Sequence, residues 1–215
     1  MAAGGPPRPC GDPVEYPDVR SQIQDGDVLL FQGTGWFSRF IRWGSGSAYS
    51  HAGVALWWGP RLMVVQAVGK GVQAVPLSLA VDTYSGQVDW YQPLPEVRAR
   101  LRPDLFLAAA LDEVGKPYAL RGLVRLAWLI WNGRLRKYRD PRRPASELFC
   151  SQLVSYCYRV AEADLVDGRA DAHTSPGDLA TCGKLVLRAA LNAPQATASL
   201  PAPAPEVEVS GCPGT

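Results

Sequence analysis

The chain contains only two histidines, His51 and His173, so any reaction that needs an imidazole has two candidates. His51 follows Ser50 at the start of a predicted strand, directly after a Gly- and Ser-rich loop, and scaffolds often place reactive side chains at such positions. The alternative is a histidine that is merely hydrogen-bonded at a strand edge. His173 lies in a polar loop near the end of the predicted domain and is interpreted as an ordinary surface residue.

Cys150 is the candidate nucleophile. Pro144 and Ser146 indicate the approach to a helix, which puts Cys150 in the first turn of that helix. Free N–H groups and the positive end of the helix dipole there favour thiolate over thiol and can stabilise an oxyanion. The alternative is a buried cysteine that packs as a small apolar side chain, which is the interpretation we favour for Cys157.

The composition argues against several other kinds of chemistry. The five cysteines are an odd number and include no Cys-x-x-Cys pair, so we expect neither a disulfide framework nor a structural zinc site. We also expect no metal and no organic cofactor. The net charge of +2, from 22 basic and 20 acidic residues, argues against nucleic-acid binding.

The first half of the chain has the pattern of strands and the second half that of helices. Short apolar runs bounded by turn residues predict strands over 27–31, 50–57, 62–68, 71–77 and 87–92, with a hairpin at Gly69-Lys70. Helical spacing then predicts helices over 107–114, over 122–131, and over about fifteen residues ending near 163. This order predicts an α+β domain with a mostly antiparallel sheet packed against helices.

One folded domain is expected over residues 19–192, between disordered tails at 1–18 and 193–215 that are rich in Pro, Gly and Ala. The chain shows no secretory signal and no apolar run long enough to span a membrane, which predicts a cytoplasmic protein and leaves open export by a non-classical route. A basic segment, residues 134–143, is interpreted as a solvated loop; contact with an anionic substrate or a membrane surface is the alternative.

Six short blocks together resemble the permuted NlpC/P60 cysteine hydrolases, particularly the YiiX/YebB-like branch. The blocks are residues 26–31 (GDVLLF), 38–41 (SRFI), 49–54 (YSHAGV), 115–118 (GKPY), 149–154 (FCSQLV) and 175–179 (SPGDL). They occur in the order found in that group, with histidine before cysteine, and the resemblance covers about residues 22–182. It implies a circularly permuted papain-like fold.

The resemblance also implies roles for individual residues. Cys150 corresponds to the nucleophile and His51 to the general base. The acidic residue that orients the imidazole in this branch is replaced by Gln66, whose carbonyl can still accept a hydrogen bond but carries no charge. Three further residues are expected in support: Tyr118 near the developing oxyanion, Ser151 at the helix N-terminus, and Asp27 as an acceptor at a strand start.

The expected activity is that of a thiol-dependent hydrolase that cleaves an amide bond, in a peptide or a cell-wall-like peptide, through an acyl-enzyme. Two alternatives stay open. One is a lipid-directed acyltransferase or deacylase that uses the same Cys–His pair, and the other is a catalytically inactive binding module. Small molecules, peptides and lipids are all candidate substrates, and the sequence does not predict the oligomeric state.

Overall fold

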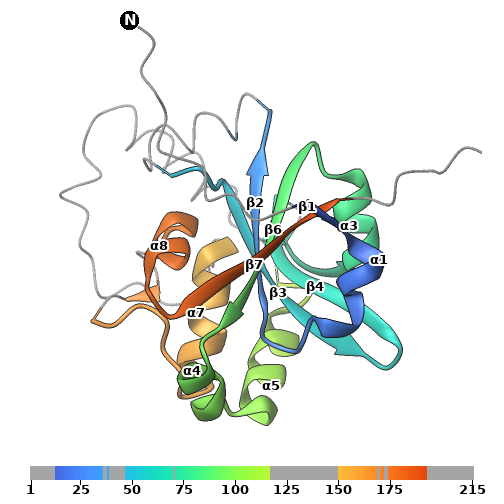
Figure 1. Cartoon of the computed structure of the whole chain (residues 1–215). Helices are drawn as coiled ribbons and strands as arrows, with labels where there is room; N and C mark the ends of the chain where they lie inside the picture. The colour runs from blue at the N-terminus through green and yellow to red at the C-terminus, as the bar shows by residue number, and fades with distance from the viewer. Residues whose placement is uncertain are drawn as a thin grey trace, which may run out of the picture.

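The fold is built on one seven-stranded sheet with helices packed against it (Figure 1). The computed structural model describes residues 13–35, 38, 47–69, 71–116, 150–168, 170–171 and 174–192. The strands are β1 (Pro13–Glu15), β2 (Val28–Gly33), β3 (His51–Trp58), β4 (Arg61–Val68), β5 (Gly71–Pro76), β6 (Gly86–Pro93) and β7 (Leu185–Asn192). Their order across the sheet is β1-β7-β6-β2-β3-β4-β5, and every pairing is antiparallel except that of β1 with β7.

Short turns fix the register in the part of the sheet that carries the candidate site. Gly59 and Pro60 join β3 to β4, and Gly59 has the positive φ of 58° that glycine tolerates without strain. Val68 pairs with Gly71 where β4 turns into β5, at the hairpin that the sequence predicts. A one-residue slip would move every side chain to the other face of the sheet, so these turns decide which residues meet.

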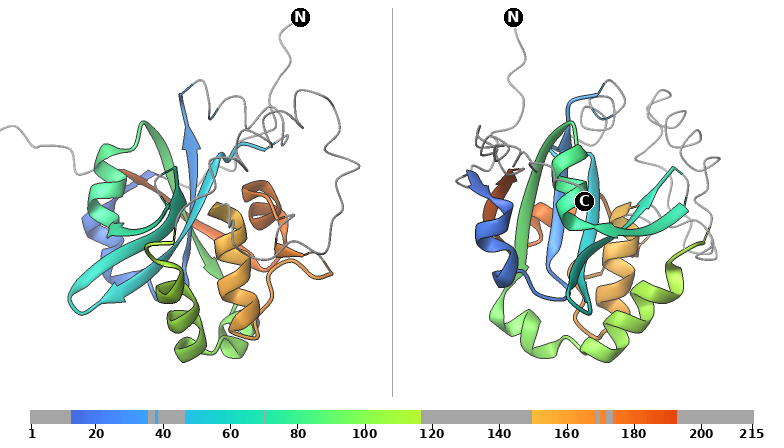
Figure 2. Two further views of the ribbon diagram at one scale, coloured as in Figure 1. Left: turned by 180° about the vertical axis from the view of Figure 1, so that it is seen from behind. Right: turned by 90° about the vertical axis from the view of Figure 1, so that its right-hand side faces the viewer.

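Helices cover both faces of the sheet. They are α1 (Tyr16–Val19), the 3-10 turn η1 (Arg20–Gln22), α3 (Leu77–Thr83), α4 (Pro95–Arg100), α5 (Pro103–Glu113), α7 (Cys150–Val160) and α8 (Pro176–Thr181). Figures 1 and 2 show α4, α5 and α7 on one side of the sheet and α1 and α3 on the other. The helix α7 packs against α5 and against strands β3 and β4.

The alternation of side chains along the strands produces two separate cores, one on each face. In β2, Val28 and Leu30 belong to the core beneath α5 and α7, whereas Leu29 and Phe31 belong to the core beneath α1 and α3. The same alternation in β3 places Ala52 in the core beneath α5 and α7. The sheet therefore separates the helix that carries Cys150 from the layer that contains α3.

The α+β class with a mostly antiparallel sheet is confirmed. All five predicted strands are present within a few residues of their expected bounds, as are the first and third predicted helices. The predicted second helix, residues 122–131, lies outside the described residues, and so do the basic segment 134–143 and residues 193–215.

The structure adds elements that the sequence did not predict. Residues 13–18, expected in the N-terminal tail, form β1 and the start of α1, because β1 pairs with β7 and Tyr16 is buried in the core beneath α3. Strand β7 follows α8, and helix α3 begins where the strand 71–77 was expected to end.

Candidate active site

Three side chains that are far apart in the sequence form one hydrogen-bonded series. Cys150 is the first residue of α7, His51 is the first residue of β3, and Gln66 lies near the end of β4. His51 is hydrogen-bonded to Cys150 on one side and, through Nε2, to Gln66 Oε1 at 2.7 Å on the other. Because the Gln66 oxygen accepts from Nε2, Nδ1 is the ring nitrogen left for the sulfur.

The electrostatics of the pair favour charge separation. Burial disfavours an anion on Cys150, but the His51 charge and hydrogen bonds from His51 and from the N–H groups of Ala52 and Ser151 outweigh it and lower the pKa of the thiol. Burial likewise disfavours the imidazolium, yet the Cys150 charge and the bonds to Cys150 and Gln66 raise the pKa of His51. The two shifts point the same way, toward a thiolate beside an imidazolium.

The other two cysteines in the described part of the chain have the opposite tendency. Cys157 is completely buried in the core beneath α7, and burial raises the pKa of its thiol, which agrees with its interpretation as a small apolar side chain. Cys182 is half-buried, and burial raises the pKa of its thiol too. Among these three free cysteines, Cys150 is therefore the one whose thiolate the fold stabilises.

The start of β3 is held firmly, which fixes the imidazole. Ser50 N–H donates to Phe31 O at 2.9 Å, and Gly33 N–H donates to Ser50 Oγ at 3.2 Å. The Ser50 hydroxyl therefore continues the hydrogen bonding between β2 and β3 beyond the last backbone pair. The Phe31 ring lies 5.0 Å from the His51 ring, centroid to centroid. One face of the imidazole is thereby packed against an aromatic side chain of β2.

A buried polar cluster anchors the residue two positions before His51. Tyr49 Oη donates to Asp89 Oδ2 at 2.7 Å and lies 2.8 Å from Tyr91 Oη, while Gln32 Nε2 donates to the same carboxylate at 2.8 Å. Asp89 is fully buried. Sequence reasoning missed this residue; its one signal was an acidic side chain inside an apolar strand, which is rarely buried without partners.

Gln66 reaches His51 because the neighbouring position is a glycine. Gly53 pairs with Gln66 across β3 and β4, and His51 lies two residues before Gly53 on the same face of the sheet. A Cβ at position 53 would lie 2.7 Å from Val64 Cγ2, 3.0 Å from Val65 O and 3.3 Å from Gln66 Cβ. The absence of a side chain there leaves room for Gln66 to lean diagonally toward the ring.

Ser151 fixes the first turn of α7. It is buried, and its Oγ donates to Thr174 O at 2.6 Å. Thr174 directly precedes Ser175, the N-cap of α8, which forms a capping box: Asp178 N–H donates to Ser175 Oγ at 3.1 Å, and Ser175 N–H donates to Asp178 Oδ2 at 2.8 Å. The hydroxyl of Ser151 is thus engaged structurally, while its N–H bonds to the Cys150 sulfur.

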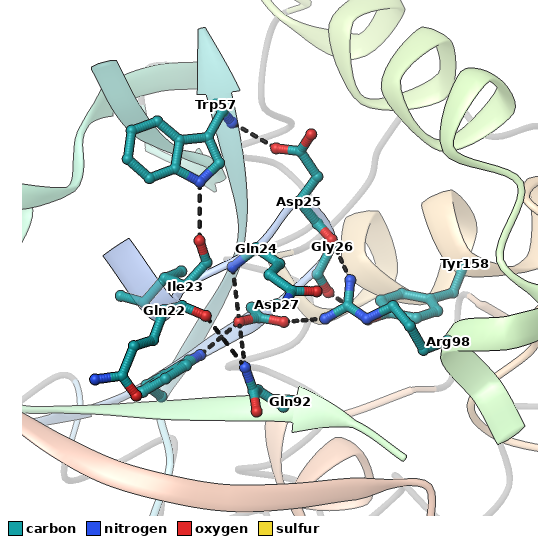
Figure 3. Close-up of polar contacts among 11 residues, drawn as sticks. Gln22, Ile23, Gln24, Asp25, Gly26, Asp27, Trp57, Gln92, Arg98 and Tyr158 are labelled. Carbon is teal, nitrogen blue, oxygen red and sulfur yellow. Dashed lines mark hydrogen bonds and ion pairs between the residues drawn. The ribbon is translucent and has the colours of Figure 1, made fainter. Parts of the chain in front are cut away.

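Asp27 lies elsewhere, in a network of polar contacts (Figure 3). It is fully buried, forms an ion pair with Arg98, and accepts hydrogen bonds from Trp90 Nε1 at 2.7 Å and Gln24 N at 3.0 Å. The neighbouring Gly26 O accepts from Tyr158 Oη, near the far end of α7. Asp27 precedes Phe31 by four residues of extended chain, about 13 Å, so it joins the sheet to the end of α7 opposite Cys150.

Two candidates from the sequence, Tyr118 and His173, lie outside the described residues. Within the described ranges, no three His, Cys, Asp or Glu side chains gather as ligands for a metal ion. No helix in the same ranges is long and apolar enough to cross a membrane.

Comparisons with known proteins reveal a distant structural likeness. A scan against protein-family models and a search of the curated proteins returned no match. Among solved structures, the chain is similar to the metalloprotein YiiX from Escherichia coli O157:H7, with 20% sequence identity and a TM-score of 0.45. That alignment covers 65% of this chain and 67% of YiiX.

Proposed function

We propose that this protein is a thiol-dependent hydrolase that cleaves an amide bond, such as that of a peptide, through an acyl-enzyme on Cys150. The observation that carries the proposal is the series Cys150–His51–Gln66, in which the pKa of the thiol is lowered and that of the imidazole is raised. A nucleophile hydrogen-bonded to a base, which is itself oriented by a third polar group, is the arrangement expected for covalent acyl transfer.

In the first half of the reaction, the thiolate of Cys150 attacks the carbonyl carbon and a C–S bond forms. The carbonyl electron pair moves onto oxygen, next to the Ala52 and Ser151 N–H groups that bond to the sulfur in the resting site. When this intermediate collapses, the C–N bond breaks, and His51 Nδ1 gives its proton to the departing amine. The products of this half are a thioester on Cys150 and a neutral imidazole.

In the second half, water attacks the thioester while His51 Nδ1 accepts a proton from it. Collapse of the second intermediate breaks the C–S bond, releases the carboxylic acid and restores the thiolate–imidazolium pair. Gln66 Oε1 keeps its bond to Nε2 throughout, which holds the ring with Nδ1 toward the sulfur. This contact argues against the inactive binding module, because the amide supplies the acceptor that orients the ring.

The proposal is tested by identifying which cysteine a thiol reagent alkylates and which cysteine an ester substrate acylates. Iodoacetamide at neutral pH should alkylate Cys150 far faster than Cys157 or Cys182, as read by peptide mass spectrometry, because of these three thiols that of Cys150 alone has a lowered pKa. Acid-quenched reactions with p-nitrophenyl acetate should trap an acetyl group on Cys150.

Variants provide the controls. Cys150→Ala and His51→Ala should abolish ester turnover with little change in melting temperature, since both side chains are only half-buried. The matched control is Cys182→Ala, another half-buried cysteine, which should retain turnover. Full turnover by Cys150→Ala would reject the proposal.

A further inference from the structure

Asp89 is a buried carboxylate that takes no part in the proposed reaction. It lies on β6, which pairs with β2 on one side and with β7 on the other. The residue is fully buried. Its two oxygens accept hydrogen bonds from three neutral side chains, those of Tyr49, Gln32 and Gln87. Because its strand is held on both sides, Asp89 is a firm attachment point for the residues that bond to it.

The three donors supply direction to this cluster rather than an opposite charge. Moving a carboxylate from water into a protein interior is costly, and apolar side chains of similar volume often stabilise a core as well or better. A hydrogen bond, however, requires a defined distance and angle, whereas apolar contacts are non-directional. In the described part of the chain every buried side-chain nitrogen and oxygen has a hydrogen-bond partner, and a fully satisfied network is rigid. The cluster therefore specifies one position for the residues that it joins.

Two connections lead from Asp89 to His51. In the first, Tyr49 Oη donates to Asp89 Oδ2 at 2.7 Å, and Tyr49 is two residues before the imidazole. In the second, Gln32 Nε2 donates to the same oxygen at 2.8 Å, and the two neighbours of Gln32 in β2 are hydrogen-bonded to Ser50. Both connections therefore fix the chain immediately before the imidazole, one through a side chain of that chain and the other through β2.

The segment that these bonds hold continues directly into the reacting groups. In the proposed reaction His51 is the base, and the next residue, Ala52, supplies an N–H that bonds to the Cys150 sulfur. Because the helix that carries Cys150 packs against β3, a displacement of this segment would move both groups relative to the sulfur. We infer that Asp89 is a positioning residue, which holds the imidazole and this N–H at the Cys150 sulfur. The inference rests on the proposed function and deepens it.

Tyr49→Phe tests this role by the removal of a single oxygen atom. The variant loses the bond to Asp89 and keeps its ring in the core, so it should fold. Misplacement of a reacting group by about 1 Å costs about a hundredfold in rate, so acylation of Cys150 by p-nitrophenyl acetate should slow by about ten- to hundredfold. Alkylation of Cys150 by iodoacetamide at neutral pH should slow as well. The pKa of His51, measured by nuclear magnetic resonance in a His173→Gln background, should fall, because the imidazolium loses part of its stabilisation by the thiolate.

Tyr158→Phe is the matched control, because it separates positioning from stability. Tyr158 is another fully buried tyrosine, and its hydroxyl donates to Gly26 O, near the end of α7 opposite Cys150. Both variants should lower the midpoint of urea denaturation to a similar extent, since each removes one buried hydrogen bond. Tyr158→Phe should leave the acylation rate, the alkylation rate and the pKa of His51 at their wild-type values.

A variant of Asp89 itself shows whether the two residues act through one bond. Asp89→Asn has one acceptor oxygen for three donors, so it should slow acylation in the same direction as Tyr49→Phe. In the double variant Asp89→Asn should add less to the effect of Tyr49→Phe than it has in the wild type, because both changes affect the same contact. Effects that multiply in full would contradict the connection through Tyr49.

The outcomes separate the positioning role from the hydrolase activity. If wild-type Cys150 is acylated and Tyr49→Phe matches the wild type in acylation, alkylation and the pKa of His51, the positioning role is refuted and the hydrolase stands. The role is likewise refuted if Tyr49→Phe and Tyr158→Phe behave alike. If wild-type Cys150 is not acylated, the hydrolase is refuted, and the alkylation rate and the pKa of His51 still decide whether the cluster positions the imidazole.

Discussion

The hydrogen bond between Gln66 and His51 offers a quantitative test of how the site is tuned. Gln66→Ala removes the acceptor at 2.7 Å from Nε2 and leaves the backbone of β4 unchanged. Gln66→Glu keeps the geometry and adds a negative charge. The two variants should move the pKa of His51 in opposite directions, because one removes a bond to the imidazolium and the other adds an attractive charge.

The size of each shift can be worked out from this contact. A hydrogen bond to a charged group contributes about 1.5 kcal/mol, and about 1.4 kcal/mol corresponds to one pH unit, so Gln66→Ala should lower the pKa of His51 by about one unit. A carboxylate within about 4 Å of an imidazolium raises its pKa by about 1–3 units. Gln66→Glu should therefore extend the alkaline limb of the pH–rate profile upward, since imidazolium is the form that protonates the leaving group.

Nuclear magnetic resonance measures these values directly. The chain has two histidines, so a His173→Gln background leaves a single imidazole signal to follow with pH. A matched control is Gln73→Ala, which removes the cross-strand partner of Gln66 on β5. Equal pKa values for His51 in the wild type, Gln66→Ala and Gln66→Glu would refute the reasoning.

Three other predictions concern the Asp27 network, Gly53 and the Cys150 thiol. Asp27→Ala leaves Arg98 and Trp90 without their carboxylate partner, so it should lower the free energy of unfolding, measured by urea denaturation, by about 3–5 kcal/mol. The rate at which iodoacetamide alkylates the folded protein should stay unchanged. Gly53→Ala should cost about 1–3 kcal/mol in the same assay and lower the pKa of His51, because the new Cβ crowds Gln66. The alkylation rate of Cys150 should rise with pH to a midpoint below the 9.0 of an ordinary thiol, because its anion is stabilised in the fold; in His51→Ala the midpoint should move up.

The part of the fold that sequence reasoning predicts best is the part built from local patterns. Strands β2 to β6 have apolar runs bounded by Gly, Pro or Asp, and α7 has a marked apolar stripe, so period and turn residues were sufficient. The proximity of Cys150 and His51 could not be predicted in this way, because no local sequence pattern relates the start of a helix to the start of a strand 99 positions earlier. That expectation came from the order of the resemblance blocks.

The elements that were not predicted depend on distant partners or lack local signals. Strand β1 has three residues and gains its conformation from pairing with Ala190, Leu191 and Asn192 of β7. Helix α3 has seven residues and no side-chain cap, and it continues directly from β5, where the sequence predicted a strand over 71–77 and no helix after it.

The strand order also has a consequence for how the protein is made. In the described sheet, β1 is paired with β7 alone, and β7 lies between β1 and β6. A chain that leaves the ribosome N-terminus first presents β6 and β1 long before their common neighbour exists. Until residue 192 has emerged, β6 remains an open edge on which a nascent copy of the same protein can dock. Expression systems that slow translation within the last forty residues of the domain would therefore favour aggregation over yield.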